Sequence, residues 1–162
     1  MRRLFFAAML LFLLGGVSVQ AQSVLRKNGV GMNIGYGGFN ENAGIGVHAR
    51  LYLNDGFRME PTFNYYFEND DWSQWDIMAN FHYVFSVANK VGLYPLVGIG
   101  VAGNSVHDHS KASFSMNFGG GVEVPVSREF TLGGELKGQF IGWDALSDKV
   151  EFVPTFKMTY CF

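Results

Sequence analysis

The chain has 162 residues, of which 48% are hydrophobic, 16% aromatic and 16% charged, with a formal net charge of −2. This length allows one domain, and the apolar content is too high for an intrinsically disordered chain. The small net charge gives no basic footprint for nucleic acid. The single cysteine permits neither an internal disulfide nor a cysteine-based zinc site.

The N-terminal segment, residues 1–21, has the three-part pattern of a cleaved secretory signal. It has two arginines after Met1, continues with an unbroken apolar run over residues 4–14, and ends with Val19 and Ala21 at the positions that a signal peptidase reads. The run is shorter than the roughly 20 apolar residues of a membrane-spanning helix. We therefore expect cleavage after position 21 and a mature domain over residues 22–162.

Apolar residues occupy every second position through most of the remaining chain. Strict alternation predicts strands rather than helices. The pattern predicts eight strands of about ten residues, the length with which a tilted strand crosses a bilayer. The predicted strands cover residues 30–36, 45–53, 57–67, 75–85, 91–101, 114–126, 130–140 and 150–162.

The connections between these segments alternate between two kinds. Short connections with turn residues cover residues 54–56, 86–90 and 127–129. The others cover residues 39–42, 68–74, 103–111 and 141–149, and all but the first are longer. Short turns at one end and long loops at the other are typical of outer-membrane barrels, whose long loops face the outside.

The two faces of the strands distinguish a soluble barrel from a membrane barrel. A soluble eight-stranded barrel places its apolar face inside, whereas a membrane barrel places that face outside. An eight-stranded interior has room only for side chains that fill it, and the many aromatic residues of the apolar face would not fit there. We therefore predict an all-β protein, an eight-stranded antiparallel up-and-down transmembrane β-barrel.

The opposite, polar face carries four basic and five acidic residues, and we expect it to line the lumen. The turn at residues 54–56 sets a register in which Arg50 faces Glu60, which predicts an ion pair. Because buried charges must pair, near-balance favours a cross-linked plug, and a narrow channel for small solutes is the alternative. The predicted lumen network consists of Arg50, Arg58, Glu60, Glu123, Glu135, Lys137 and Lys157.

Four prolines fall inside predicted strands, where proline removes a donor from the hydrogen-bond ladder. We expect bulges or short strand breaks at these positions, which are Pro61, Pro95, Pro125 and Pro154.

Other residues with possible chemistry carry weaker signals. Glu68, Asp70 and Asp71 could bind calcium but lack a full spaced loop. The His-Asp-His-Ser run at 107–110 contains the residue types of an acyl hydrolase, yet adjacent residues rarely reach triad geometry. We expect Cys161 to be a buried spectator. The sequence therefore predicts no catalytic site, cofactor or metal.

Several segments resemble small bacterial outer-membrane barrels of the outer-membrane protein X and outer-membrane protein A type. They are residues 93–101, 118–126 and 132–136. The C-terminal positions are similar to the signal recognised by the barrel assembly machinery, and they are Phe156, Met158, Tyr160 and Phe162.

The resemblance covers residues 22–162 and is specific for architecture. It implies a monomer in the cell outer membrane, in contact with outer-membrane lipid and lipopolysaccharide and with the assembly machinery during biogenesis. It is weak for activity, and from the residues we expect a non-enzymatic role, structural or in surface interaction through the extracellular loops. The alternatives are a narrow solute channel and a lipid-modifying enzyme.

Overall fold

The protein is described by a computed structural model that places residues 26–37, 42–69, 72–88, 91–106, 109–142 and 150–162. The predicted signal segment, residues 1–21, lies outside the described residues. Within the described ranges, no helix has the length and apolar character needed to cross a bilayer.

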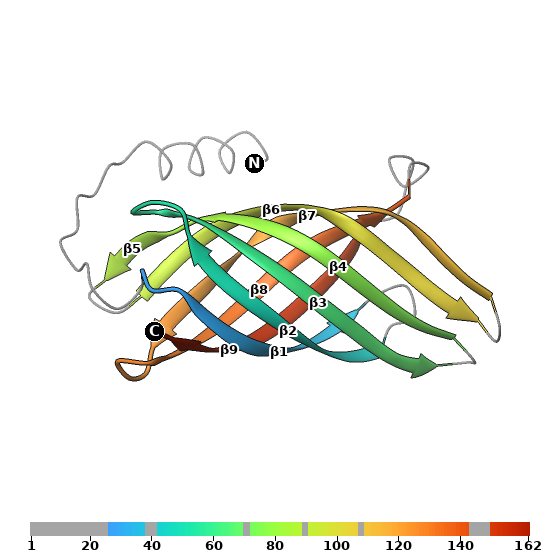
Figure 1. Ribbon diagram of the computed structural model, residues 1–162, viewed down its shortest axis with the longest axis horizontal. Helices are drawn as coiled ribbons and strands as arrows, with labels where there is room; N and C mark the ends of the chain where they lie inside the picture. Colours follow the sequence, from blue (N-terminus) through green and yellow to red (C-terminus); the bar gives the residue numbers. More distant parts are fainter. Residues whose placement is uncertain (1–25, 38–41, 70–71, 89–90, 107–108, 143–149) are drawn as a thin grey trace, which may run out of the picture.

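The described chain is almost entirely antiparallel β-sheet (Figure 1). Consecutive strands pair with each other except β4 and β5, which both pair with β6, and β1 also pairs with β9. Because β4 and the short β5 pair with successive parts of β6, they act as one wall segment of a closed eight-stranded barrel. The strands are β1 (Gly29–Gly37), β2 (Asn42–Tyr52), β3 (Phe57–Asn69), β4 (Trp72–Tyr83), β5 (Phe85–Ala88), β6 (Val91–Val106), β7 (His109–Pro125), β8 (Phe130–Ile141) and β9 (Glu151–Cys161).

The predicted orientation of the two faces is confirmed. Phe152 and Phe162 on the outer face are each 67% exposed, whereas Arg58 and Glu60 on the inner face are fully buried. A soluble protein shows the opposite distribution, with apolar side chains inside and charges outside. The wall therefore presents its apolar side chains outward and encloses its polar ones.

Two predicted loops are instead parts of long hairpins. The predicted connection 103–111 is wrong, because β6 and β7 pair residue by residue up to Val106 opposite His109. The connection 68–74 is likewise wrong, since β3 continues to Asn69 and β4 begins at Trp72. Polar residues in these stretches hide the period of two, because strands that leave a bilayer no longer need an apolar face.

The expected bulges and strand breaks are not found at the prolines, because β3, β6 and β9 run through Pro61, Pro95 and Pro154 and the register shifts lie elsewhere. What the prolines do mark is a gap in one of the two ladders of a strand, or a strand end. The β2–β3 ladder lacks the pairs Ala49–Pro61 and Arg50–Glu60, while Pro61 remains paired with Ala79 of β4. Its missing N–H therefore falls on the β2 side, and the carbonyl of Ala49 receives no ladder bond there.

The other three prolines lie at comparable interruptions or at a strand end. Pro95 pairs with Gly120 of β7, and on its other side the wall divides into β4 and β5. Pro154 pairs with Leu136 of β8, whereas the β1–β9 ladder stops one residue away, at Thr155. Pro125 is the last residue of β7.

The two ends of the barrel differ. The short turns at residues 53–56 and 126–129 lie at the end that holds the start of β1 and the C-terminus, which we call the terminal end (Figure 1). The β6–β7 hairpin reaches furthest from it at the opposite, loop end (Figure 1). A small apolar cluster of Val84, Tyr94 and Leu96 lies inside the wall near the terminal end.

Candidate functional site

Six charged side chains fill one level of the lumen, which we call the ion-pair layer. Five strands supply them: β2, β3, β7, β8 and β9. All six are at most 5% exposed. Alternation places them there, because each occupies an inward position of its strand. The members of the layer are Arg50, Arg58, Glu60, Glu123, Glu135 and Lys157.

Glu123 anchors one side of the layer. Arg58 Nη1 donates to both of its carboxylate oxygens, at 2.9 and 2.7 Å. Arg50 Nη2 lies 3.1 Å from Glu123 Oε2. The Arg58 guanidinium also stacks over the Tyr94 ring, 4.6 Å from its centroid, and its Nε donates to His82 Nδ1 at 2.9 Å. Arg58 is therefore held by hydrogen bonds at Nε and Nη1 and by an aromatic ring over its guanidinium.

Lys157 anchors the other side. Its Nζ donates to Glu60 Oε1 and to Glu135 Oε2, each at 2.5 Å. Arg50 Nε donates to Glu60 Oε2 at 3.4 Å, so the predicted Arg50–Glu60 pair is present. The hydroxyl of Tyr94 donates to Glu135 Oε2 at 3.2 Å. Alternating charges thus form one chain across the lumen, from Glu123 through Arg50, Glu60 and Lys157 to Glu135.

The layer is electrically balanced, with three cations against three anions. Isolated charges without water are costly, and burial is tolerated only when each charge is paired and hydrogen-bonded. The geometry satisfies this condition with contacts between strands that are far apart in sequence. The six charges of the layer are therefore paired with one another across the lumen.

A second polar network surrounds the fully buried carboxylate of Asp76. Asn64 Nδ2 donates to Asp76 Oδ1 at 2.6 Å, and Gln139 Nε2 donates to Asp76 Oδ2 at 3.4 Å. Asn64 in turn accepts from Asn33 Nδ2 at 2.5 Å, and Asn33 Oδ1 lies 3.3 Å from His48 Nδ1. Neutral amide donors aimed at one carboxylate therefore stabilise its charge.

At the far end of this network, Thr159, His48 and Asn33 are connected like the nucleophile, base and orienting group of a catalytic triad. Thr159 Oγ1 lies 2.9 Å from His48 Nε2, while His48 Nδ1 faces the Asn33 carbonyl. Thr159 is only 1% exposed and points into the packed lumen. Because a nucleophile must reach its substrate, this group serves packing rather than catalysis.

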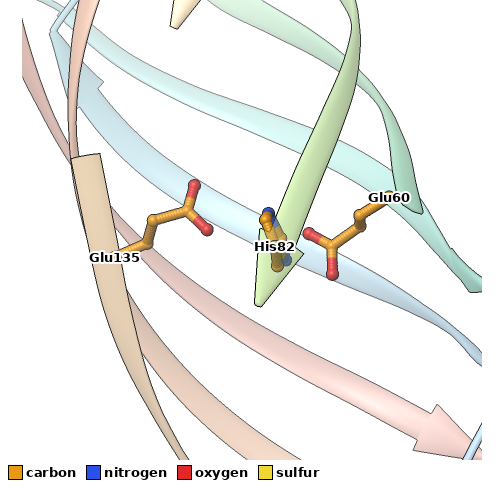
Figure 2. Close-up of side chains that lie close together, drawn as sticks. All are labelled: Glu60, His82 and Glu135. Atoms are coloured by element: carbon orange, nitrogen blue, oxygen red, sulfur yellow. The ribbon is translucent and has the colours of Figure 1, made fainter. Parts of the chain in front are cut away.

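Glu60, His82 and Glu135 bring three potential metal ligands within 4.8 Å of one another (Figure 2). Figure 2 shows the His82 ring lying between the two carboxyl groups. The ammonium of Lys157 already contacts both carboxylates. The bond from Arg58 to His82 Nδ1 leaves the ring proton on Nε2, which then cannot ligate a metal. The contacts make this cluster an ion-pair site.

The remaining predicted residues have varied positions. Lys137 is 2% exposed at the inward position of β8 between Glu135 and Gln139. Cys161 is buried, with its sulfur 3.5 Å from Thr131 Oγ1. The C-terminal positions Phe156, Met158, Tyr160 and Phe162 all point outward and are 43–67% exposed. The side chains of Glu68, Asp70, Asp71 and residues 107–110 lie outside the described residues.

Sequence reasoning missed several members of these networks. Tyr94 was not expected to join the charges, although it occupies an inward position between Leu93 and Pro95. The amides Asn33 and Asn64 were also missed. The alternation along each strand would have found all three, because each lies an even number of positions from an inward charged residue or another inward residue of its strand.

Comparison with known proteins places the chain among outer-membrane barrels. Neisserial surface protein A has a similar structure, with a TM-score of 0.66 and 14% identity over 83% of this chain and 96% of that one. The N-terminal barrel domain of Pseudomonas aeruginosa OprF has a TM-score of 0.57 and 20% identity, over 84% of this chain and 98% of that one. The outer membrane enzyme PagL has a TM-score of 0.54 and 14% identity, over 83% of this chain and 99% of that one. These likenesses establish the fold alone.

No curated protein has a significantly similar sequence. The profile of the outer membrane protein beta-barrel domain family matches residues 7–144, which is most of the chain. This match agrees with the closed eight-stranded barrel, its outward apolar face and the structural neighbours, and it implies an outer-membrane location. The chain belongs to the outer membrane protein β-barrel domain family.

Proposed function

We propose that this protein is a non-enzymatic outer-membrane barrel with a closed lumen, which acts through the surface at its loop end. The observation that carries the proposal is the ion-pair layer. Its charged side chains form ion pairs with one another, with N–O distances of 2.5–3.4 Å between five strands. A conducting lumen would instead need charges that are free to exchange with passing ions.

Planar bilayer recordings test the closed lumen. The intact protein is expected to give no steady single-channel current. The charge-balanced double variant Arg58→Ala/Glu123→Ala opens one side of the layer and is expected to raise the conductance. Steady currents from the wild-type barrel would support the narrow channel instead and would refute the plug.

The length of the β6–β7 hairpin supports a role outside the membrane. β6 has 16 residues and β7 has 17, whereas about 9–11 residues suffice for a tilted strand to cross a bilayer. Several residues of each strand therefore extend past the hydrocarbon core, and Figure 1 shows this hairpin reaching furthest at the loop end. A paired hairpin presents its surface to a partner with little loss of conformational entropy on binding.

This proposal requires the loop end to face the outside and both termini to face the periplasm. An epitope inserted at position 107 should be labelled on intact cells. The same epitope inserted at position 55 should be labelled only after the outer membrane is permeabilised. The reverse pattern would overturn the orientation and, with it, the surface role.

The PagL likeness makes lipid modification the alternative that needs a direct test. Incubating lipopolysaccharide with the purified barrel should release no fatty acid. The His-Asp-His-Ser run at 107–110 provides the matched variant, His107→Ala/His109→Ala. Fatty acid released by the wild type and not by this variant would establish an enzyme and refute the non-enzymatic role.

Export through a cleaved signal is part of the same proposal. The mature protein recovered from outer-membrane fractions should start at Gln22. We also propose a monomer that contacts lipid and lipopolysaccharide and that the barrel assembly machinery inserts. An N-terminus that retains residues 1–21 would contradict cleavage.

A further inference from the structure

Described residues of the outer wall line a groove of about 690 Å³ whose lining is mainly apolar. Most of its lining belongs to the lipid-facing side of strands β1–β4, β8 and β9, and the inner-face residues His48 and Thr62 also contribute. Ala49 and Pro61 form its floor, and larger side chains, including Met32, Val47 and Phe63, stand beside it. A hollow in a wall that otherwise bears large apolar side chains must be filled by something in the membrane.

Strand register gives the groove a direction. One row of facing outward residues runs from Phe130 to Tyr160, Val30, Ala49 and Pro61. Phe130 is the first residue of β8, whereas Pro61 is the fifth residue of β3, so the row climbs away from the terminal end. Four steps between strands span about 19 Å, which is comparable to an extended fatty acyl chain.

The lower end of the row meets basic side chains. Arg128 precedes Phe130 by two residues and is exposed in the turn between β7 and β8, where the exposed acidic residue Glu129 separates the two. Lys27 lies beside it, because Lys27 Nζ donates to the Arg128 carbonyl at 3.2 Å. Tyr160 and Phe130 pack at 5.3 Å between ring centroids at the same level. Aromatic rings beside basic groups are the usual surroundings of lipid headgroups.

We propose that this groove holds one phospholipid of the periplasmic leaflet with an anionic headgroup. Its phosphate contacts Lys27 and Arg128, and one acyl chain lies along the row over Val30, Ala49 and Pro61. The two ends of the groove match the two ends of such a lipid, since one is basic and interfacial and the other is apolar and deep. The leaflet follows from the orientation proposed above, while the site itself does not depend on the closed lumen.

Native mass spectrometry of the detergent-purified barrel with added phosphatidylglycerol tests the site. The wild type should retain one phosphatidylglycerol molecule at activation energies that strip other lipids. Ala49→Phe fills the floor and should lower retention at least fivefold. Val122→Phe, an outward position of β7 on the opposite wall, is the matched control and should retain the lipid. Heat-modifiable mobility shows that each variant is folded.

A second arm tests the headgroup. Lys27→Ala/Arg128→Ala should remove the preference for phosphatidylglycerol over phosphatidylcholine while both lipids still bind. Equal retention of phosphatidylglycerol by the wild type, Ala49→Phe and Val122→Phe would reduce the groove to ordinary annular lipid and overturn the proposal. A dimer that Ala49→Phe disrupts would also overturn it, because a second copy would then occupy the groove.

Discussion

Replacing Lys157 by methionine tests whether the ion-pair layer stabilises the barrel as one unit. The Lys157 ammonium is the shared partner of Glu60 and Glu135. Without it, Glu60 keeps Arg50 at 3.4 Å, whereas Glu135 keeps only the Tyr94 hydroxyl at 3.2 Å. The substitution therefore leaves the buried Glu135 carboxylate without its ion-pair partner, with Lys137 as the other cation that acts on it.

The geometry sets the size of the effect. Removing one partner of a buried ion pair costs about 3–5 kcal/mol in unfolding free energy, because the other charge stays buried and unpaired. The double variant Lys157→Met/Glu135→Gln restores the balance to two cations against two anions. It should recover most of the loss and retain a deficit of about 1–2 kcal/mol for the lost hydrogen bonds.

Urea unfolding in lipid vesicles, followed by tryptophan fluorescence, measures these free energies. Asp55→Asn is the matched control, since it removes a charge from the exposed Arg26–Asp55 pair, where Asp55 is 98% exposed. That change should stay within about 1 kcal/mol. If the double variant is no more stable than Lys157→Met, the charges do not act together and the argument for a balanced layer fails.

The remaining predictions concern other parts of the wall and lumen. Gly46→Ala should destabilise the barrel by about 1–3 kcal/mol through overpacking, because its Cβ would lie 2.6 Å from both Asn33 Nδ2 and the Phe63 carbonyl oxygen. Gly134→Ala, where the nearest atom is 3.9 Å away, should be neutral in the same urea assay. Asp76→Asn should cost about 1–3 kcal/mol, since it turns one acceptor of the Asn64 and Gln139 amides into a donor; an unchanged midpoint would contradict the network. Phe162→Ala should lower the amount of protein assembled in the outer membrane without changing refolding in vesicles, because Phe162 is 67% exposed and packs little inside the fold; equal loss in both assays would point to stability instead.

The architecture could be predicted from the sequence because a lipid-facing wall imposes a strict period of two. Arg50 and Glu60 were paired correctly from one turn, since register in a tight hairpin follows from the turn itself. The hairpin ends were not predictable in this way. Beyond the bilayer, residues such as Asn104 and Ser105 stay in the ladder with no apolar face to reveal it.

The contacts across the lumen could not be predicted in detail either. Lys157 lies 97 positions from Glu60 and 22 from Glu135, and only barrel closure brings the three together. The alternation along a strand predicts that these side chains point inward, but it does not predict at which level of the barrel each one lies. That level depends on the stagger between neighbouring strands, which the described ladders give and a single sequence does not.

The Arg50–Glu60 pair has a second consequence for the wall. It joins β2 and β3 from the inside at the one level where Pro61 removes a ladder bond from that strand pair. On the outside of the same level, Ala49 and Pro61 form the floor of the groove. Because a barrel stays closed only if neighbouring strands stay joined, a side-chain ion pair here substitutes for the missing backbone bond. The ion-pair layer therefore also joins the two strands at the level where their backbone ladder is interrupted.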